Sequence, residues 1–403
     1  MKNWNKKIQY AKVHICGQET EIFGIPDRLY QLASNSKAFT ALGILLLVQQ
    51  KRLKLDLPTD AYSDKLCFSD KHGLQQTVTI RQLLNHYGGL DKNTIRFQHE
   101  GEMDITDAAQ AITKMPLKSA PGTKFCYATG GYIVLGRIIE IISGQSYGEF
   151  IRKNIFAPLD LDATDVEQVP LRGLKDGLFG VRYANWKGCG AFAPAGYLIS
   201  SPKNCARWLE LLLGNIEIEN EYKILLQRSL DLRDYVQTKE NGVFYGFGWY
   251  YDKRQDVYFH DGRNPYFSSC IAFSSAGKGA AALCNIHLSR SVEEVFEFMG
   301  LEKEKRLPHN FKAMIVRIGI ALLFISCALV LHVVGVGVKA IVFSVFATTI
   351  TQIAIYLISG ELSIRQQYLW LPEWLFVLLW VFPAGIVILI MGVLNLFSIR
   401  GGL

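Results

Sequence analysis

The sequence predicts an α+β domain followed by three membrane-spanning helices. Strand-like patterns occur at both ends of the first 300 residues, helical patterns lie between them, and strongly apolar sequence follows Phe311. Strands at the two ends of one domain can pair in a single sheet against which the intervening helices pack. We therefore expect a catalytic-sized domain at 1–300, a charged linker at 301–312 and a membrane domain at 313–403.

The elements of the first domain follow from local patterns. Alternating residues predict strands around Gly17, and an apolar run after Lys37 predicts a buried helix that starts at Ser34. His86 is expected to be a structural turn residue at the end of a short helix rather than a ligand. The predicted strands are 12–25, 245–251, 257–260, 267–273 and 280–286, and the predicted helices are 34–50, 78–90, 133–142 and 202–213.

Three apolar segments have the length of a membrane span. They cover about 314–336, 340–359 and 374–397, and a helix needs roughly 20 residues to cross the hydrocarbon layer. The third is uncharged throughout, while the second is diluted by threonines. Basic residues near the spans favour a cytoplasmic domain, and no apolar signal segment occupies the first 30 residues.

Charge and cysteine content narrow the functional classes. The net charge of +7 fits a basic cluster beside the membrane, and no concentrated basic stripe points to nucleic acid. Seven of the 8 cysteines precede the spans without the spacing of a disulfide framework, as is typical of reduced thiols. No ligand cluster has zinc spacing, so neither a metal nor another cofactor is expected.

A Ser-x-x-Lys pattern heads the buried helix. Ser34 and Lys37 are three residues apart and lie on one helix face. A serine hydroxyl becomes an effective nucleophile beside a base, and a lysine becomes a base when desolvation lowers its pKa. Taken alone the pattern is also typical of a helix-capping serine with a solvated lysine.

Further motifs in a fixed order resemble the class C-like branch of the serine β-lactamase and penicillin-binding-protein superfamily. They are LASNSKAFTALGILLLVQQKRLKLD (32–56), VTIRQLLNHYGGL (78–90), YATGGYIVLGRIIEIISGQSYGEFI (127–151), PAGYLISSP (194–202), YGFGWY (245–250) and HDG (260–262). The resemblance implies a β-lactamase/transpeptidase-like fold, an antiparallel sheet flanked by helices with a helical subdomain. HDGRNPYFSSCIAF (260–273) and the three spans also resemble membrane-anchored peptidases that mature nonribosomal-peptide prodrugs, such as the colibactin-maturation peptidase.

The resemblance assigns catalytic roles. Ser34 is the expected nucleophile and Lys37 its base, and Tyr127, its phenol acidified by Lys37, relays a proton to the leaving amine. His260 stands where the family has the lysine of Lys-Thr-Gly, and supplies a hydrogen bond or a partial positive charge beside Tyr127. The backbone N–H groups of Ser34 and Arg263 are the expected oxyanion hole.

Three expected substrate-binding positions depart from the prodrug-peptidase pattern. Thr129 stands where the superfamily has asparagine and these peptidases tend to have serine, so a hydroxyl remains. Asn264 falls where they contact an asparagine side chain, and Phe192 replaces a histidine that binds the same cap. The loss of that polar partner weakens the case for D-asparagine specificity. The start of the chain also departs, because relatives carry a signal segment and a helix before the first strand.

The resemblance implies a membrane-anchored serine peptidase that removes an acylated D-amino-acid cap, D-asparagine-like, from a nonribosomal-peptide prodrug. Its expected partners are a small acylated peptide and the lipid bilayer, with a homodimer through the membrane helices as a further option. The family's exported substrates favour an extracytoplasmic catalytic domain on the cell membrane, against the charge pattern. Two alternatives remain: a broader D-aminopeptidase, esterase or β-lactamase-like hydrolase, and a non-catalytic penicillin or cell-wall sensor.

Overall fold

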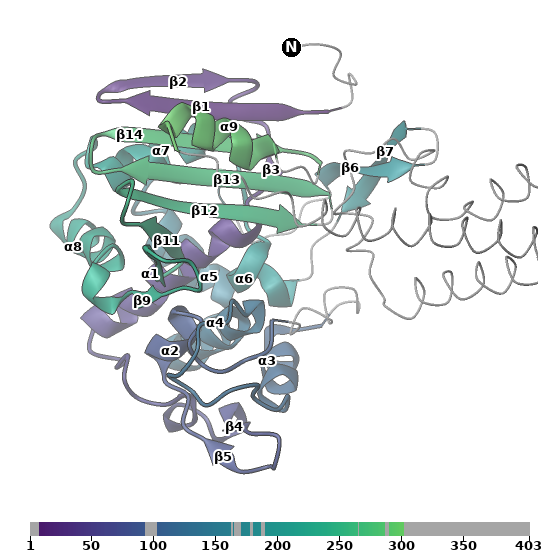
Figure 1. The fold of residues 1–403 in the computed structure, drawn as a ribbon, viewed down its shortest axis with the longest axis vertical. Coiled ribbons are helices and arrows are strands. Elements are labelled where there is room, and N and C mark those ends of the chain that lie inside the picture. Colours follow the sequence, from purple (N-terminus) through teal and green to yellow (C-terminus); the bar gives the residue numbers. More distant parts are fainter. Residues whose placement is uncertain are drawn as a thin grey trace, which may run out of the picture. The chain divides into compact units, whose positions relative to one another are not determined.

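An eight-stranded antiparallel sheet organises the computed structural model (Figure 1). The structure describes residues 8–92, 103–162, 164, 171–177, 180–186, 190–264, 266–286 and 290–301. No helix in these ranges combines the length and apolarity that crossing a bilayer requires. The three expected spans and residues 302–312 of the linker lie outside the described residues, so the division of the chain at 300 and 312 stays a prediction.

The two ends of the domain share the sheet, as the sequence predicted. The strand order is β2-β1-β14-β13-β12-β11-β10-β9, which places the N-terminal hairpin beside the last strand, with Val13 opposite Ala281. In this order the strands are β2 (Glu19–Phe23), β1 (Tyr10–Cys16), β14 (Lys278–Cys284), β13 (Phe267–Ser274), β12 (Val257–Asn264), β11 (Trp249–Asp252), β10 (Val243–Gly246) and β9 (Val236–Gln237).

One predicted strand, 245–251, is two strands in the structure. The chain reverses at Phe247 and Gly248, whose φ angles are 49° and 89°. The resulting β10–β11 hairpin pairs Gly246 with Trp249. Alternating aromatic residues continue across the turn, so periodicity alone did not reveal the reversal.

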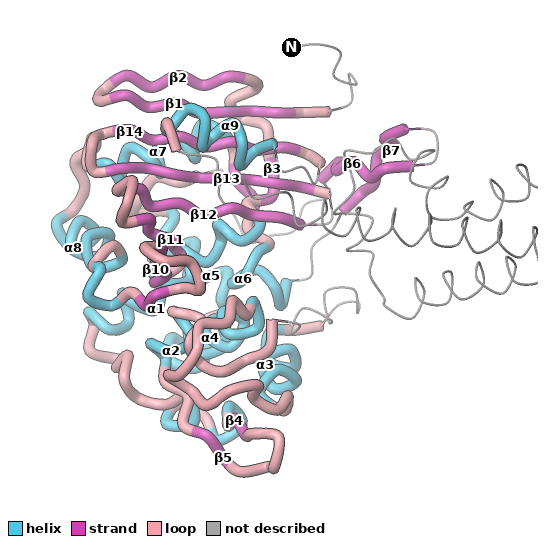
Figure 2. The backbone as a smooth tube through the Cα atoms, viewed as in Figure 1, coloured by secondary structure: helices cyan, strands magenta, loops and turns pink. Residues whose placement is uncertain are grey.

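Helices fill the middle of the chain. They are α1 (Ser36–Gln49), α2 (Ile80–Leu84), α3 (Ile105–Thr113), α4 (Thr129–Ser143), α5 (Tyr147–Ile151), α6 (Ala193–Gly196), α7 (Pro202–Leu213), α8 (Asn220–Ser229) and α9 (Arg290–Met299). Figure 2 shows helices on both faces of the sheet and a largely helical region beyond its β9 end. The boundaries of α7 match the prediction because Ser201 caps Asn204 and Pro202 occupies the first turn.

Both faces of the sheet are covered. One face packs on α9, where Val295 and Met299 join the apolar residues Cys270 and Ala282. The other face packs on α7 in the main core, to which the buried residues of α1 also belong. Every residue of β13 is buried, including Ser268, Ser269 and Ser274, so this strand shows no alternation of buried and exposed positions.

Helix α1 is buried on nearly all sides, with exposed residues only at its C-terminal end. It contacts α4, α5, α6 and α8, and its all-round apolar character is typical of a central helix. This burial surrounds the first turn, where Lys37 lies, with apolar neighbours. The sequence therefore positions the candidate catalytic residues at the start of the most protected helix.

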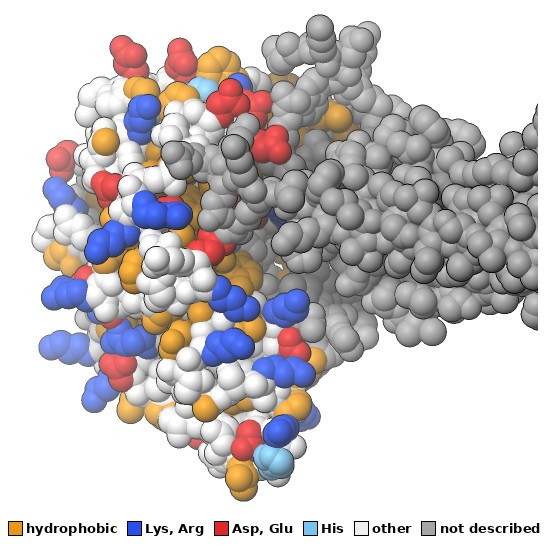
Figure 3. Space-filling model, viewed as in Figure 1, with side chains coloured by type: hydrophobic (Ala, Val, Ile, Leu, Met, Phe, Trp, Pro, Cys, Tyr) orange, Lys and Arg blue, Asp and Glu red, His pale blue; other side chains and the backbone are white. Residues whose placement is uncertain are grey.

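Short strands complete the fold. The pairs are β3 (Tyr30–Gln31) with β8 (Ile199–Ser200), β4 (Phe68–Ser69) with β5 (Gln75–Gln76), and β6 (Leu171–Gly177) with β7 (Gly180–Trp186). The chain forms two compact units, Met1–Lys175 with Tyr183–Glu302, and Asp176–Arg182 with Lys303–Leu403. The main sheet and the helices belong to the first; of the second, the described residues are part of the β6–β7 hairpin. On the face in Figure 3, basic and acidic side chains of the first unit are interspersed.

Candidate active site

Ser34 lies on a strained turn directly before α1. The turn is a 3-10 segment, Ala33–Asn35, and the α-helix begins at Ser36 rather than at the predicted Ser34. Ala33 has a φ of 48°, which a non-glycine residue rarely adopts. Three contacts hold this conformation: Asn35 Nδ2 donates to Ser269 Oγ (2.8 Å), Ser36 Oγ donates to the Ala33 carbonyl (2.6 Å), and Leu198 N donates to Ser36 Oγ (3.1 Å). Such supported strain is characteristic of functional sites.

Lys37 reaches Ser34, as the spacing predicted. Its Nζ lies 3.1 Å from Ser34 Oγ and donates to the Ala195 carbonyl at 2.5 Å. The side chain is fully buried, and burial lowers the pKa of Lys37 to about 7, an effect that the carboxylate of Asp261 opposes. A substantial neutral fraction of Lys37 is therefore available near pH 7 to accept the proton of Ser34.

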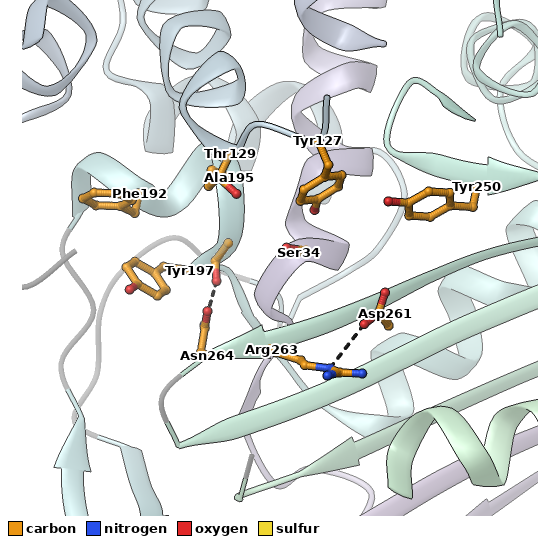
Figure 4. A pocket seen from close by; sticks show the side chains of 11 residues that line it. Ser34, Tyr127, Thr129, Phe192, Ala195, Tyr197, Tyr250, Asp261, Arg263 and Asn264 are labelled. Carbon is orange, nitrogen blue, oxygen red and sulfur yellow. Dashed lines mark hydrogen bonds and ion pairs between the residues drawn. The ribbon is translucent and has the colours of Figure 1, made fainter. Parts of the chain in front are cut away.

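Tyr127 completes the group, with one difference from expectation. Its hydroxyl points toward Ser34 (Figure 4) and lies 3.4 Å from His260 Nε2, and its ring lies 5.1 Å from Lys37 Nζ. Burial raises the pKa of Tyr127 well above its usual value, and the nearby Ser34 hydroxyl only partly opposes this. The expected acidification by Lys37 is therefore wrong: the resting side chain is a phenol, suited to donate a proton rather than to accept one.

His260 supplies a hydrogen bond and no positive charge. Burial lowers the pKa of His260 to about 4, so its ring is neutral near pH 7. Its Nδ1 donates to the Asp261 carbonyl at 2.6 Å, which leaves Nε2 as an acceptor for the hydroxyls of Tyr127 (3.4 Å) and Tyr245 (3.3 Å). Of the two predicted roles for His260, the structure supports the hydrogen bond.

These groups open into a cavity of about 480 Å³ that has two unlike sides (Figure 4). Phe192 and Tyr197 lie on one side of Ser34, and Tyr250 and Asp261 lie on the other. The full lining is Ser34, Tyr127, Thr129, Phe192, Ala195, Gly196, Tyr197, Tyr250, Asp261, Arg263 and Asn264. All three predicted substrate-binding residues therefore reach the cavity.

The contacts of those residues bear on specificity. Asn264 Nδ2 donates to Gln31 Oε1 (2.6 Å) and to the Gly196 carbonyl (2.8 Å). Both amide hydrogens of Asn264 therefore already bind acceptors within the chain rather than a substrate. Phe192 is almost fully buried and packs against Tyr197, with ring centroids 5.8 Å apart. This side of the cavity therefore offers apolar surface where the resemblance expected groups for an asparagine cap.

Arg263 lies at the edge of the cavity with its side chain turned toward Asp261. Its Nε is 3.4 Å from Asp261 Oδ2, and both side chains are partly exposed. Arg263 and Ser34 both line the cavity, which is compatible with the predicted oxyanion hole. That role stays a prediction. In the described ranges, no three side chains of His, Cys, Asp or Glu are arranged to hold a metal ion.

His86 has a larger part in the site than the sequence indicated. Its carbonyl accepts a hydrogen bond from Cys126 N (2.9 Å), and its Nδ1 accepts one from Ala128 N (3.2 Å). His86 is therefore hydrogen-bonded to the residues on both sides of Tyr127. Its ring lies 4.2 Å from that of Tyr127, and its φ is 55°. Burial, with the nearby Lys37 and His260, lowers the pKa of His86 well below its usual value, so this ring is neutral as well.

Other site residues were missed although they lie within recognised motifs. Tyr245 and Tyr250 belong to YGFGWY and Asp261 to HDG. Asp261 lies within the HDG motif, but an aspartate at this position could line a cavity or lie on the exposed surface of a strand, and the sequence did not distinguish the two. Ala195 binds Lys37 through its backbone carbonyl, and because every residue has such a carbonyl, the sequence gave no indication of this role.

Known proteins resemble this chain in sequence. The sequence model of the family described as Beta-lactamase matches residues 25–300. Protein flp of Staphylococcus aureus is 27% identical over 314 residues, 74% of this chain and 60% of the relative, so the chain spans less than two thirds of that protein. Penicillin-binding protein 4* of Bacillus subtilis is 35% identical over 146 residues, 35% of this chain and 31% of the relative.

Solved structures share the fold. A D-stereospecific amidohydrolase from Streptomyces sp. has a TM-score of 0.60 at 22% identity, and covers 73% of this chain and 95% of its own. A D-amino acid amidase from Ochrobactrum anthropi SV3 has a TM-score of 0.59 at 21% identity, and covers 73% of this chain and 94% of its own. At these identities the likeness shows the fold alone.

Proposed function

This chain belongs to the beta-lactamase family and is a serine hydrolase, and from that premise we propose that it cleaves an amide bond that follows a D-amino-acid residue. The observation that carries the proposal is the position of Ser34 Oγ, which lies 3.1 Å from the Nζ of a buried Lys37 and faces the hydroxyl of a protonated Tyr127. An amide needs a proton donor for its poor leaving group, and this site holds one beside the nucleophile.

The proposed reaction has two steps. Ser34 Oγ attacks the amide carbonyl and its proton passes to Lys37 Nζ, while the backbone N–H groups of Ser34 and Arg263 hold the oxyanion. Tyr127 gives its hydroxyl proton to the leaving nitrogen and is reprotonated from Lys37, and the C–N bond breaks to leave an ester on Ser34. Water then attacks that ester as Lys37 takes its proton, the ester C–O bond breaks, and Lys37 returns the proton to Ser34 Oγ, which releases the acid and restores the free serine.

The proposed substrate is a peptide with an acylated D-residue at its N-terminus, as in the maturation of a peptide prodrug. The D-configuration draws support from the fold shared with D-amino acid amidases. Asn264 is engaged by Gln31, and Phe192 is apolar, so we propose an apolar D-side chain in place of D-asparagine. Membrane attachment through 314–336, 340–359 and 374–397 belongs to the proposal and rests on sequence alone.

A panel of fluorogenic amides tests this function. N-acetyl-D-Phe, N-acetyl-D-Asn and N-acetyl-L-Phe amides of aminomethylcoumarin are compared on the full chain, with Ser34→Ala as the control for the nucleophile. We expect D-Phe to exceed both others by about tenfold or more in kcat/KM, a usual range for pocket discrimination. Equal turnover of the L-amide, or turnover of nitrocefin or simple esters alone, would favour the broader hydrolase.

Membrane side has a separate test. Cysteines placed in the catalytic domain are labelled in intact cells with an impermeant maleimide. Labelling before lysis is expected for an extracytoplasmic domain, whereas labelling only after lysis would place the domain in the cytoplasm.

A further inference from the structure

In the proposed reaction, the position of Tyr127 places the leaving group on the side of the cavity that holds Asp261. Tyr127 must reach the leaving nitrogen, and its hydroxyl lies 3.4 Å from the ring of His260, the residue before Asp261. The rings of Tyr127 and Tyr250 are stacked with centroids 6.3 Å apart. Atoms attached to the leaving nitrogen therefore extend toward Tyr250 and Asp261, opposite Phe192 and Tyr197 (Figure 4).

That side carries a fixed negative charge. The carboxylate of Asp261 is 37% exposed and lines the cavity with Ser34. Its field reaches the catalytic groups, because it acts on the pKa values of Lys37, His260 and Tyr127. Apart from the Arg263 guanidinium, the titratable groups there are neutral or only partly charged at pH 7: the His260 ring, the phenols of Tyr127 and Tyr250, and the partly protonated Lys37.

We propose that Asp261 is a specificity-determining residue that excludes substrates whose leaving amine carries a free carboxylate. This inference rests on the proposed amide hydrolysis. In a C-terminal dipeptide or a penicillin, a carboxylate is attached to the carbon next to the leaving nitrogen, and it would enter the field of Asp261. The accepted leaving groups are amines without a carboxylate on that carbon. They are the N-terminus of a longer peptide, an amino-acid amide, or an amine that also carries a positively charged nitrogen. The enzyme thus acts on caps at N-termini and not as a carboxypeptidase.

Arg263 moderates this repulsion without reversing it. Its Nε lies 3.4 Å from Asp261 Oδ2, so the guanidinium partly neutralises that carboxylate. The Arg263 side chain is 47% exposed to water, which screens its charge. Exposed pairs of this kind are weak, and the two charges do not cancel at a substrate that contacts only one of them. Loss of the Arg263 guanidinium should therefore increase the discrimination against carboxylates.

Matched substrates test the inference on the full chain. The D-residue preferred in the fluorogenic panel is built into acyl-D-residue-glycine and acyl-D-residue-glycinamide, which differ only in the carboxylate. We expect wild type to prefer the glycinamide by about tenfold, Asp261→Asn to bring the ratio near one, and Arg263→Gln to widen it. Glu217→Gln, which removes an exposed charge outside the cavity lining, is the control and keeps the wild-type ratio.

Ionic strength gives a second readout that does not depend on folding of a variant. Salt screens exposed charges, so the wild-type ratio should approach one between 0.05 and 0.5 M salt, as expected for a Debye length that falls from roughly 14 to 4 Å. A wild-type preference for the free acid that Arg263→Gln abolishes would overturn the inference and make Arg263 a carboxylate receptor. An equal rate on both substrates would also overturn it. Failure to cleave either substrate, or any amide in the panel, would instead contradict the proposed function.

Discussion

The amine nitrogen of Lys37 lies 3.1 Å from the hydroxyl oxygen of Ser34 at the start of a helix that buries it completely. Because the base must be neutral and the pKa of Lys37 is lowered to about 7, kcat/KM for an amide should rise through pH 7 and then level off. Because the pKa of His260 is about 4, its titration causes no second change in kcat/KM between pH 5 and pH 9. Stopped assays from pH 5 to 9 check this. If kcat/KM were already above half of its maximum at pH 5, a group other than Lys37 would be the base.

The same burial predicts a gain in stability when Lys37 is removed. The unfolded chain binds the extra proton between about pH 7 and pH 10.5, so wild-type stability rises with pH across that window and the full cost of the buried charge is present below pH 7. Lys37→Met should raise Tm by a few degrees at pH 6 and by less at pH 9, with loss of activity. Calorimetry checks this; a Met variant less stable than wild type at pH 6 would show that the amine's bond to Ala195 dominates.

Sequence reasoning found the catalytic group but not its surroundings. Ser34, Lys37, Tyr127 and His260 lie in motifs with fixed order, and the structure brings them together as expected. The protonation states of Tyr127 and His260 could not be read from the motifs, because burial of each ring decides them.

Backbone conformation was the other gap. The α-helix starts at Ser36 because Ala33–Asn35 form a 3-10 turn, and the predicted strand 245–251 reverses at Phe247 and Gly248, which have positive φ angles. Ala33 and Phe247 are not glycines, so their residue types did not indicate a positive φ, and Gly248 alone did not separate the two strands. The engagement of Asn264 with Gln31, 233 positions away, likewise depends on tertiary folding.

Tyr127→Phe should separate amide from ester hydrolysis. The phenol is placed to protonate a leaving amine, whereas p-nitrophenolate departs without a proton. We expect amide kcat to fall by roughly 10²–10⁴-fold, the usual contribution of a general acid, and p-nitrophenyl ester hydrolysis to fall far less. Rates on both substrates with the same acyl group give the ratio, and an equal loss on both would assign Tyr127 to attack by Ser34 instead.

His86 should act through the position of Tyr127. His86→Leu removes the acceptor for Ala128 N and cannot adopt a φ of 55° without strain, whereas His86→Asn keeps an acceptor and tolerates that conformation. We expect the Leu variant to shift the amide-to-ester ratio in the same direction as Tyr127→Phe, and the Asn variant to restore much of it. A ratio unchanged in a folded Leu variant, as judged by circular dichroism, would limit His86 to stability.

Gly262 allows β12 to approach the turn that carries Ser34. A Cβ there would lie 2.5 Å from the Leu32 carbonyl oxygen and 2.9 Å from Ala33 Cβ, and it would also collide with the Ser269 hydroxyl that binds Asn35. Gly262→Ala must therefore push β12 away from the nucleophile, at a cost of about 1–3 kcal/mol in stability and most of the activity.

The control for Gly262 is Gly190→Ala, since a Cβ at Gly190 meets no atom of the described residues within 4 Å. Urea denaturation and amide turnover of both variants check the prediction. Because Leu32, Ala33 and Ser34 are consecutive, displacement of β12 should reduce labelling of Ser34 by a fluorophosphonate together with kcat. Full labelling with lost turnover would instead place the damage in the later step, where water attacks the acyl-enzyme.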